Sequence, residues 1–567
     1  MLRERYELEA DALWAHLKDL ARRTPRLEGL YARDADPRVA RLVQSAAFAF
    51  AVAHNRLDDD GQTLVRPLVA RALPGTLRPR PSSTVLELSA SSRSGPAGGS
   101  TYVAHAGQAR VPFQVVWPAT VVPMALEDVV LDRLDARRQV LRFALVSRSA
   151  MSLAAALPDV VRFFVHLEPR SVALDLVHAL RASQAPGRTK WFGGKKELLA
   201  DRALPERAVS WVQVDTVEPP LVSARADRFR SGSLLQDLYA FPEGFCFFDL
   251  HLGGSVERGA ERLEVTLPLG HVVEGAGAFS SEHLRLFCAP ATNQFVSAIE
   301  PVPPTGASEA TLRVAGKPHA EILEVRALAT TSLRGVGRTA LRSWESPDVP
   351  RSFDPEETYF ALEQRPAADD GRTELRATFG RLEAFPGAPA GIVEGEVLAC
   401  DGVLTGGIGL GEVGSPREGG ANITRVTPSR RALLGQNHAW RMSAYARMPP
   451  ARLAECARLA EFLRLHDPFG MQDEALRIVQ PAFTGMQHTR EHQLTDGVLG
   501  WGDRFVLDTE ATDCREGELW LLGALVHGAL AERSEALSFV RLVLRRGGAP
   551  FADYGTRPGA RLPFPLG

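Results

Sequence analysis

Two histidines and a glutamate near the end of the chain have the spacing of a zinc-binding motif. His488, Glu491 and His492 form the pattern HxxEH. On a helix, histidines one turn apart can hold one Zn²⁺ ion while the glutamate activates a zinc-bound water. Such a motif needs a long helix and a third ligand, but Gly485 precedes it and TDGVLGWG follows. We therefore expect a solvated polar loop, and a zinc metallohydrolase acting through these three residues is the remote alternative.

A glycine-rich segment contains the spacing GxGxxG at Gly409, Gly411 and Gly414. In a dinucleotide site this spacing precedes a helix whose N-terminus holds the pyrophosphate. The residues that follow, SPREGGANITRV, have no helical period. The sequence therefore predicts a mobile loop over 402–421 and no bound cofactor.

Two further polar clusters have structural interpretations. The segment WFGGKKE (191–197) lacks the spacing and the final Ser or Thr of a P-loop, so we expect a surface turn. Asp58, Asp59 and Asp60 could hold Mg²⁺ or Ca²⁺, but acidic residues between two helices also stabilise the N-terminus of the second helix, and we expect this capping role. No Ser-His-Asp or Cys-His arrangement follows from spacing alone. The sequence thus predicts no catalytic residue and no metal site, and hence a protein that is not an enzyme.

Composition excludes several classes of protein. A chain of 567 residues exceeds what one hydrophobic core accommodates, so we expect several domains. The net charge of −2 gives no overall attraction to nucleic acid or to anionic lipid. Five cysteines without a CxxC pair indicate unpaired thiols in a reducing cytoplasm. No signal peptide is evident, and no apolar run approaches the ~20 residues needed to cross a bilayer, so direct membrane insertion is not expected.

The N-terminal region has the pattern of three helices, over 2–23, 36–57 and 62–73. In the second helix, apolar residues from Val39 to Leu57 recur at spacings of three and four, and Phe48 and Val52 make the opposite face apolar as well. A helix that is apolar all round is buried on more than one side. We therefore expect a helical bundle shared with a partner. The predicted packing residues are Leu13, Leu17, Leu42, Phe48, Phe50 and Leu57. The predicted polar rim consists of Arg41, Asp58, Asp59 and Asp60.

The rest of the chain alternates short strands with a few helices, which predicts a multi-domain α+β fold. Among others, strands are predicted over 140–146, 392–400, 504–508 and 537–544, and helices over 171–181, 449–465, 473–479 and 518–530. Composition and turn signals divide the chain into five segments. They are an N-terminal helical region (1–81), a first α+β domain (82–215), a second β-rich domain (216–340), a β-rich segment with the glycine-rich loop (341–430), and a C-terminal α+β region (431–567).

The N-terminal stretch also resembles a known family. DPRVARLVQSAAF, NRLDDD and ALPGTLRPRPSS follow one another over about fifty positions. Their order and spacing resemble the N-terminal signature of TssF (VasA/ImpG), a baseplate subunit family of the type VI secretion system. The matching residues are Asp36, Pro37, Val39, Arg41, Leu42, Phe48, Leu57, Asp58, Asp59, Pro74, Pro79, Pro81 and Ser82.

The resemblance extends along the chain. FPEGFCFF (241–248) is similar to the family's FPE.F.FF segment, although the physical role of these aromatic residues is expected to be a hydrophobic core. CAPATNQF (288–295) is similar to its C.P..N.F segment, and the C-terminal residues around Phe505, Leu522 and Phe539 are similar to its end. The chain departs from the pattern after Cys400, where the family's NRD residues are missing.

The resemblance implies a structural wedge component of a contractile injection machine, with a fold related to phage baseplate wedge proteins. In this family two copies join one TssG subunit, and the wedges surround the spike hub and start sheath assembly, with contacts to TssE and TssK. A cytoplasmic location at a baseplate docked to the envelope complex, and self-association within the wedge, follow from the same resemblance. A wedge protein of a phage tail or of an extracellular contractile particle is the alternative.

Overall fold

The chain forms two compact units in the computed structural model. One unit consists of Met1–Ala72 with Gly435–Ala444, and the other of Leu73–Leu434 with Tyr445–Gly567. The structure describes residues 2–24, 37–72, 79–88, 100–148, 153, 157–216, 218–221, 230–254, 256–332, 337–344, 357–366, 373–381, 386–389, 391–408, 411–415, 419–427, 438–467, 483–495, 498–510 and 514–560.

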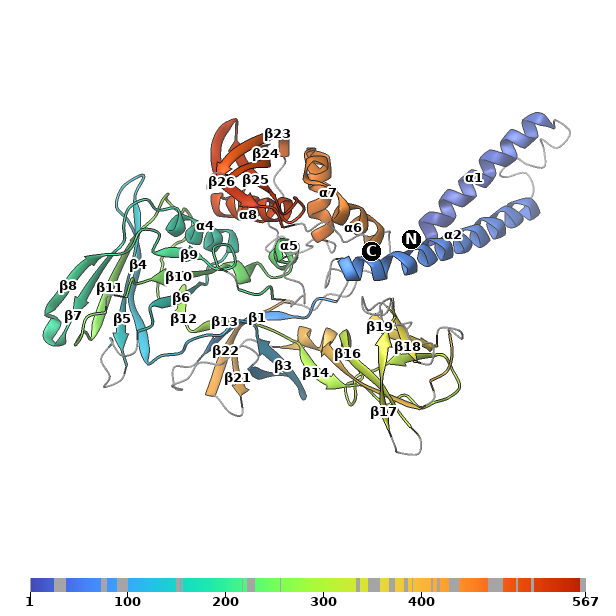
Figure 1. Ribbon diagram of the computed structural model, residues 1–567, viewed down its shortest axis with the longest axis horizontal. Helices are drawn as coiled ribbons and strands as arrows, with labels where there is room; N and C mark the ends of the chain where they lie inside the picture. Colours follow the sequence, from blue (N-terminus) through green and yellow to red (C-terminus); the bar gives the residue numbers. More distant parts are fainter. Residues whose placement is uncertain are drawn as a thin grey trace. The chain divides into compact units, whose positions relative to one another are not determined.

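The first unit is built on two long helices that run antiparallel, α1 (Leu2–Arg23) and α2 (Pro37–Ala72) (Figure 1). Small apolar residues let the helices approach closely, because Ala47 and Ala51 are fully buried. The Nδ1 atom of His54 lies 2.7 Å from the Oε1 atom of Glu9, which links the two helices through their side chains.

Helix α2 is continuous, so the prediction of separate helices over 36–57 and 62–73 is wrong. The helix passes through Gly61 and Pro67. An interior proline removes one backbone hydrogen bond, but the flanking turns can continue the helix with a local kink. The predicted capping role of Asp58, Asp59 and Asp60 is wrong as well, because these residues lie inside one helix and no second helix begins after them.

The second unit contains a closed barrel of six antiparallel strands. Its interior is filled by apolar residues that include Leu86, Tyr102 and Phe113. In spatial order the strands are β1 (Ser83–Leu88), β13 (Cys288–Thr292), β3 (Ala109–Val115), β2 (Thr101–Ala106), β21 (Gly411–Ser415) and β22 (Gly419–Val426).

Two strands of this barrel come from the segment that the sequence predicted to be a mobile loop. Residues 402–407 form a short 3-10 helix, η6 (Gly402–Gly407), and β21 and β22 follow as a hairpin. The prediction of a loop over 402–421 is therefore wrong. Glycine has low strand propensity and gives no apolar alternation, so the strands left no pattern in the sequence. The barrel draws its strands from three of the five predicted segments, because paired strands need not be consecutive.

Two further sheets share an aromatic core. The Phe143 and Phe163 rings lie 5.0 Å apart and bring one sheet against the other, and Phe163 stacks on Phe248 at 5.1 Å. The four-stranded sheet has the order β12 (Leu284–Leu286), β6 (Val160–Val165), β10 (Phe247–His251) and β9 (Val209–Trp211). The five-stranded sheet has the order β4 (Met124–Arg133), β5 (Gln139–Ser147), β11 (Arg262–Pro268), β7 (Arg188–Phe192) and β8 (Leu198–Ala203).

A seven-stranded sheet forms a separate core around Phe379, Val393 and Val397. Its strands are antiparallel apart from the pair β17 and β18. The spatial order is β14 (Phe295–Ala298), β20 (Ile392–Cys400), β16 (Glu321–Thr331), β17 (Arg338–Ser343), β18 (Tyr359–Pro366), β19 (Thr373–Gly380) and β15 (Glu309–Leu312).

The C-terminal sheet lies against a buried helix, α8 (Glu516–Ala531) (Figure 1). Helix α8 connects two parallel strands, and its other sides contact α4 (Arg170–Arg181) and α5 (Arg230–Ala240). The sheet has the order β23 (Phe483–Thr495), β24 (Val498–Thr509), β25 (Ser538–Arg546) and β26 (Ala549–Pro558). The sequence predicted β24, α8 and β25 but not β26.

The region before this sheet is only partly helical. The predicted helix over 449–465 is interrupted, because it consists of η7 (Pro450–Leu453) and α7 (Cys456–His466), after α6 (His438–Arg447). The described residues also form two short helical turns, η2 (Gly194–Lys196) and η4 (Pro242–Phe245). The predicted helix over 473–479 lies outside the described residues. The α+β prediction is confirmed, and among the described residues no helix has both the length and the apolarity needed to span a bilayer.

Candidate partner interface

Several large apolar side chains of α2 are exposed in the two-helix unit. Leu42, Phe48 and Phe50 of α2 retain 70%, 53% and 47% of their accessible surface, and Val52 is also exposed. Val43, Ala47 and Ala51, at a spacing of four, are buried instead. Since residues seven and four apart share one helix face, Arg41, Phe48 and Val52 form an exposed stripe. Leu42 and Phe50 lie further round the helix, also outside the buried stripe, and we call the whole exposed side with Arg41, Leu42, Phe48, Phe50 and Val52 the open face of α2.

The predicted interface residues fall into three groups. Arg41, Leu42, Phe48 and Phe50 belong to the open face of α2. Leu13 and Leu17 of α1 are half-buried, on the same side of that helix as buried Ala10. The side chains of Leu57, Asp58, Asp59 and Asp60 lie outside the described part of α2, although their backbone is helical.

The HxxEH motif lies in strand β23, so the expectation of a loop is wrong. The zinc alternative needs the three residues on one helix, and the strand does not provide that arrangement. Residues four apart in a strand are separated by roughly 13 Å along its axis, which is too far for His488 and His492 to hold one ion. Each side chain has a partner on β24 instead: His488 Nε2 lies 2.7 Å from Asp503 Oδ1, and the His492 ring packs edge-on against Trp501.

The two other motifs also have structural places. Gly411 and Gly414 lie in β21, which is followed by β22 and not by a helix, and Gly409 lies outside the described residues. No helix N-terminus is therefore available for a pyrophosphate at this point. Residues 193–197 of WFGGKKE form the predicted turn between β7 and β8, whereas Trp191, which is buried, and Phe192 end strand β7.

All five cysteines are free, as the sequence predicted. Cys456 is partly exposed, and the others are buried. Burial raises the pKa of the Cys400 and Cys514 thiols to about 12, and it raises the pKa of Cys246 and Cys288 as well. Because the thiolate is the reactive form, these buried cysteines are chemically inert.

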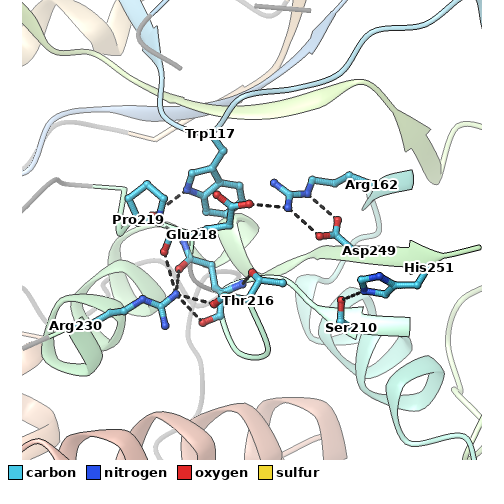
Figure 2. Close-up of polar contacts among 10 residues, drawn as sticks. Trp117, Arg162, Ser210, Thr216, Glu218, Pro219, Arg230, Asp249 and His251 are labelled. Atoms are coloured by element: carbon cyan, nitrogen blue, oxygen red, sulfur yellow. Dashed lines mark hydrogen bonds and ion pairs between the residues drawn. The ribbon is translucent and has the colours of Figure 1, made fainter. Parts of the chain in front are cut away.

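A buried polar network holds the segment around Glu218 against the four-stranded sheet (Figure 2). The Arg162 guanidinium donates to both carboxylate oxygens of Asp249, at 2.7 and 2.8 Å, and to Glu218 at 2.7 Å. Burial opposes the charge, but these two carboxylates outweigh it and raise the pKa of Arg162. Trp117 Nε1 donates to the Pro219 carbonyl, and Arg230 donates to the Thr216 and Glu218 carbonyls. Because these donors tie the segment 216–219 to Trp117, Arg162 and Arg230, this network is a structural clamp.

A second clamp joins the barrel to the seven-stranded sheet at Asn293. Its amide nitrogen donates to the Pro112 carbonyl at 2.7 Å and to Asp401 at 3.0 Å, and its amide oxygen accepts from the Asp401 N–H at 2.7 Å. Lys317 Nζ lies 2.7 Å from Asp401 Oδ1. Asn293 belongs to the C.P..N.F segment. The family resemblance thus singled out this residue, and the structure shows its physical role. The aromatic residues of FPEGFCFF, by contrast, are buried as the sequence predicted.

One cluster with the chemistry of a metal site lies away from every predicted position. Asp175, His178 and His271 are the group of described residues whose donor atoms could meet on an ion. Burial, followed by the neighbouring His271, lowers the pKa of His178 to about 3, so its imidazole is neutral near pH 7. Asp175 and His178, three residues apart in the predicted helix 171–181, were visible in the sequence. His271 comes about a hundred residues later, just after strand β11.

Comparison with known proteins identifies the family. The family model for the type VI secretion system protein TssF matches residues 2–561. The chain is 24% identical over 631 aligned positions to the type VI secretion system component TssF1 of Pseudomonas aeruginosa strain PAO1, with 99% of each chain covered. A chain of the cryo-electron microscopy structure of the type VI secretion system TssK-TssF-TssG baseplate subcomplex has the same fold, with a TM-score of 0.73 and 19% identity, covering 92% of this chain and all of that one. The chain thus belongs to the TssF family, whose members are structural components of the type VI secretion baseplate.

Proposed function

We propose that the open face of α2 is the surface through which this baseplate component binds a helical TssG-like subunit. The observation that carries the proposal is the exposure of Leu42, Phe48 and Phe50 on a helix whose opposite side is already covered. Several large exposed apolar side chains on one helix indicate an interaction site. An amphipathic helix of the partner, with apolar residues at spacings of three and four, matches such a surface.

The energetics favour this surface as an anchor. Burying one large apolar side chain contributes about 1.5–3 kcal/mol, and one aromatic anchor of that strength changes the dissociation constant by roughly 10- to 100-fold. Arg41, at the edge of the stripe, is exposed and supplies a polar rim. The acidic run Asp58, Asp59 and Asp60 and the apolar Leu57, further along α2, complete the proposed interface, together with Leu13 and Leu17 of α1.

Family membership supports the proposed partners. The related solved complex contains TssK and TssG with its TssF subunit. We propose that this chain likewise assembles with TssG-like and TssK-like subunits, with two copies per TssG-like subunit. Contacts to a TssE-like subunit, the spike hub and the sheath, in a cytoplasmic baseplate docked to the envelope complex, extend the same proposal. This role is structural and requires no catalytic group.

Co-expression with the TssG-like protein encoded beside it, followed by native mass measurement, tests the proposal. The expected result is a stable complex with two copies of this chain. A monodisperse monomer in the presence of the partner would contradict it.

The variant Phe50→Asp locates the interface. It places a charge on the open face of α2 and should weaken the complex at least 10-fold. Leu537→Asp is the matched control, because Leu537 is 95% exposed in the turn before β25 and lies outside the proposed surface. Equal binding by Phe50→Asp and the wild type would remove α2 from the interface.

A further inference from the structure

Three side chains from two distant parts of the sequence meet beside helix α8. Asp175 and His178 are three residues apart on α4, so they lie on one helix face. His271 follows strand β11. One donor atom from each can be chosen so that all three lie within 4.8 Å of one another. Imidazole and carboxylate together are ligands that zinc and related divalent metals prefer.

One ring nitrogen of His178 has no hydrogen-bond partner among the described residues. The residue is only 7% exposed, and this nitrogen, Nδ1, is buried. The Trp520 ring stacks on the imidazole at 5.4 Å, and the His271 ring lies 5.4 Å away on another side. A buried polar atom of this kind normally finds a partner. A metal ion bound beside the ring would satisfy this nitrogen.

The other two side chains are already oriented by their neighbours. His271 Nε2 lies 3.1 Å from Asp175 Oδ1, while its Nδ1 lies 3.4 Å from Glu516 Oε2. Asp175 Oδ1 also accepts the N–H of Gly517 at 3.0 Å. In metal sites a carboxylate often binds the second nitrogen of a ligating histidine, as Glu516 does here, and a hydrogen bond often orients a ligating carboxylate, as Gly517 does for Asp175.

The backbone around the cluster leaves little room for movement. A Cβ at Gly517 would lie 2.4 Å from the Leu174 carbonyl oxygen, and a Cβ at Gly270 would lie 2.9 Å from the Ala182 carbonyl carbon. The two glycines therefore permit the close approach of α8 and of the His271 segment to α4. The ligands come from elements that this packing fixes.

Charge and access are compatible with a cation. Arg515 Nη1 lies 3.7 Å from Asp175 Oδ2, so the positive charge is next to the oxygen that does not contact His271. Arg181 is engaged by both carboxylate oxygens of Asp215 at 2.7 and 2.9 Å. A cleft of about 1090 Å³, lined by His178, His271 and Glu516 among others, reaches the cluster from solvent and gives an ion an entry path.

We propose that Asp175, His178 and His271 bind a divalent transition metal ion of the zinc class, with the remaining position open to the cleft. Tetrahedral zinc requires donor atoms about 3.4 Å apart, from bonds of about 2.0–2.1 Å, so the side chains close in modestly on binding. The ion would fasten α4 to the end of β11, beside the start of α8. The proposal is independent of the open face of α2, which lies in the other unit.

Titration of the metal-stripped full-length chain with Co²⁺, followed by its visible absorption bands, tests the proposal, and Zn²⁺ competition completes the measurement. We expect one ion per chain with tetrahedral-type bands that Zn²⁺ displaces. His178→Ala should weaken Co²⁺ binding at least 10-fold. His488→Ala is the matched control, because His488 also pairs with an aspartate but belongs to no such cluster, and it should leave binding unchanged.

Because His178 is buried, its variant could fail to fold, and His271→Gln provides the second measurement. His271 is only half-buried, so its replacement should keep the fold, checked by circular dichroism, and still weaken binding at least 10-fold. Zn²⁺ should raise the unfolding temperature of the wild type and not that of His271→Gln. No Co²⁺ bands in the wild type, or equal binding by folded His271→Gln, would overturn the proposal.

Discussion

Helices α2 and α8 share an apolar sequence pattern but lie in opposite environments. Both carry apolar residues on every side over several turns. Helix α8 is covered by α4, α5 and the C-terminal sheet, so that nearly all of its residues are buried. Over its described side chains, α2 is covered along Val43, Ala47 and Ala51 but exposes Leu42, Phe48 and Phe50.

The comparison shows what an apolar pattern does and does not establish. It predicts that a helix requires cover on several sides, but it does not say whether the same chain provides the cover. For α8 the cover comes from elements between residues 170 and 558 of the same chain. For the open face of α2 the described residues of its own unit do not provide it, and we propose a second chain as the source.

The largest effect is expected in α8, where removal of a buried side chain leaves a cavity. Leu521 is fully buried. Leu521→Ala should lower the free energy of unfolding by about 2–5 kcal/mol, the range for such core truncations. Chemical denaturation of the isolated chain measures it. A loss below about 1 kcal/mol would mean that α8 is less tightly covered than its burial indicates.

An added methyl group on the same helix should have a smaller effect. A Cβ at Gly523 would lie 2.1 Å from the hydroxyl of Tyr554, which donates to the Trp520 carbonyl at 2.8 Å. Gly523→Ala should therefore displace Tyr554 and destabilise the chain by about 1–3 kcal/mol. Gly547→Ala, in an exposed turn with open space around it, controls for the substitution, although its positive φ adds a backbone cost.

Acid should loosen α8 through His527. Burial lowers the pKa of His527, whose Nε2 lies 2.9 Å from the Val540 carbonyl. Below about pH 6.5 the unfolded chain binds a proton at this residue that the folded chain does not, so stability falls as pH falls, by at most about 1.4 kcal/mol per pH unit. Unfolding temperatures between pH 7.5 and 5 measure this slope, and it should be shallower in His527→Gln. Identical slopes would exclude His527 as a contributor.

The smallest effect on stability is expected at the open face of α2. Phe48→Ala removes an exposed ring and should change the free energy of unfolding of the isolated chain by no more than about 0.5 kcal/mol. The same variant should weaken the complex with the TssG-like subunit. A large loss of stability in the isolated chain would show instead that this chain covers Phe48 itself, and it would end the contrast with α8.

The sequence predicted elements with strong periodicity and missed those without it. Helices α4 and α8 and strands such as β5 and β20 have clear apolar patterns and appear near their predicted positions. Strands β21 and β22 are too rich in glycine to show alternation, and β23 carries mostly polar residues, so these were predicted as loops. The continuous course of α2 through Pro67 also contradicts a local rule, because local preference is weaker than the sum of the surrounding turns.

The candidate site was partly accessible from the sequence. Apolar spacing selected all five of the residues Leu13, Leu17, Leu42, Phe48 and Phe50, and the structure shows that the last three are exposed while Leu13 and Leu17 are half-buried in the hairpin. Their place in an interface stays a prediction. The cluster of Asp175, His178 and His271 was not accessible, because it depends on the place where β11 ends relative to α4. Contacts between residues about a hundred positions apart leave no spacing signal.

The closed barrel makes the order of biosynthesis matter. Strand β1 pairs with β13 and with β22, so its neighbours emerge from the ribosome roughly 200 and 330 residues after it. During translation its edges must wait unpaired until residue 426 is available, and unpaired edges invite wrong pairing. A nascent or truncated chain that ends before β22 therefore has an open barrel, and we expect such fragments to aggregate or to require a chaperone.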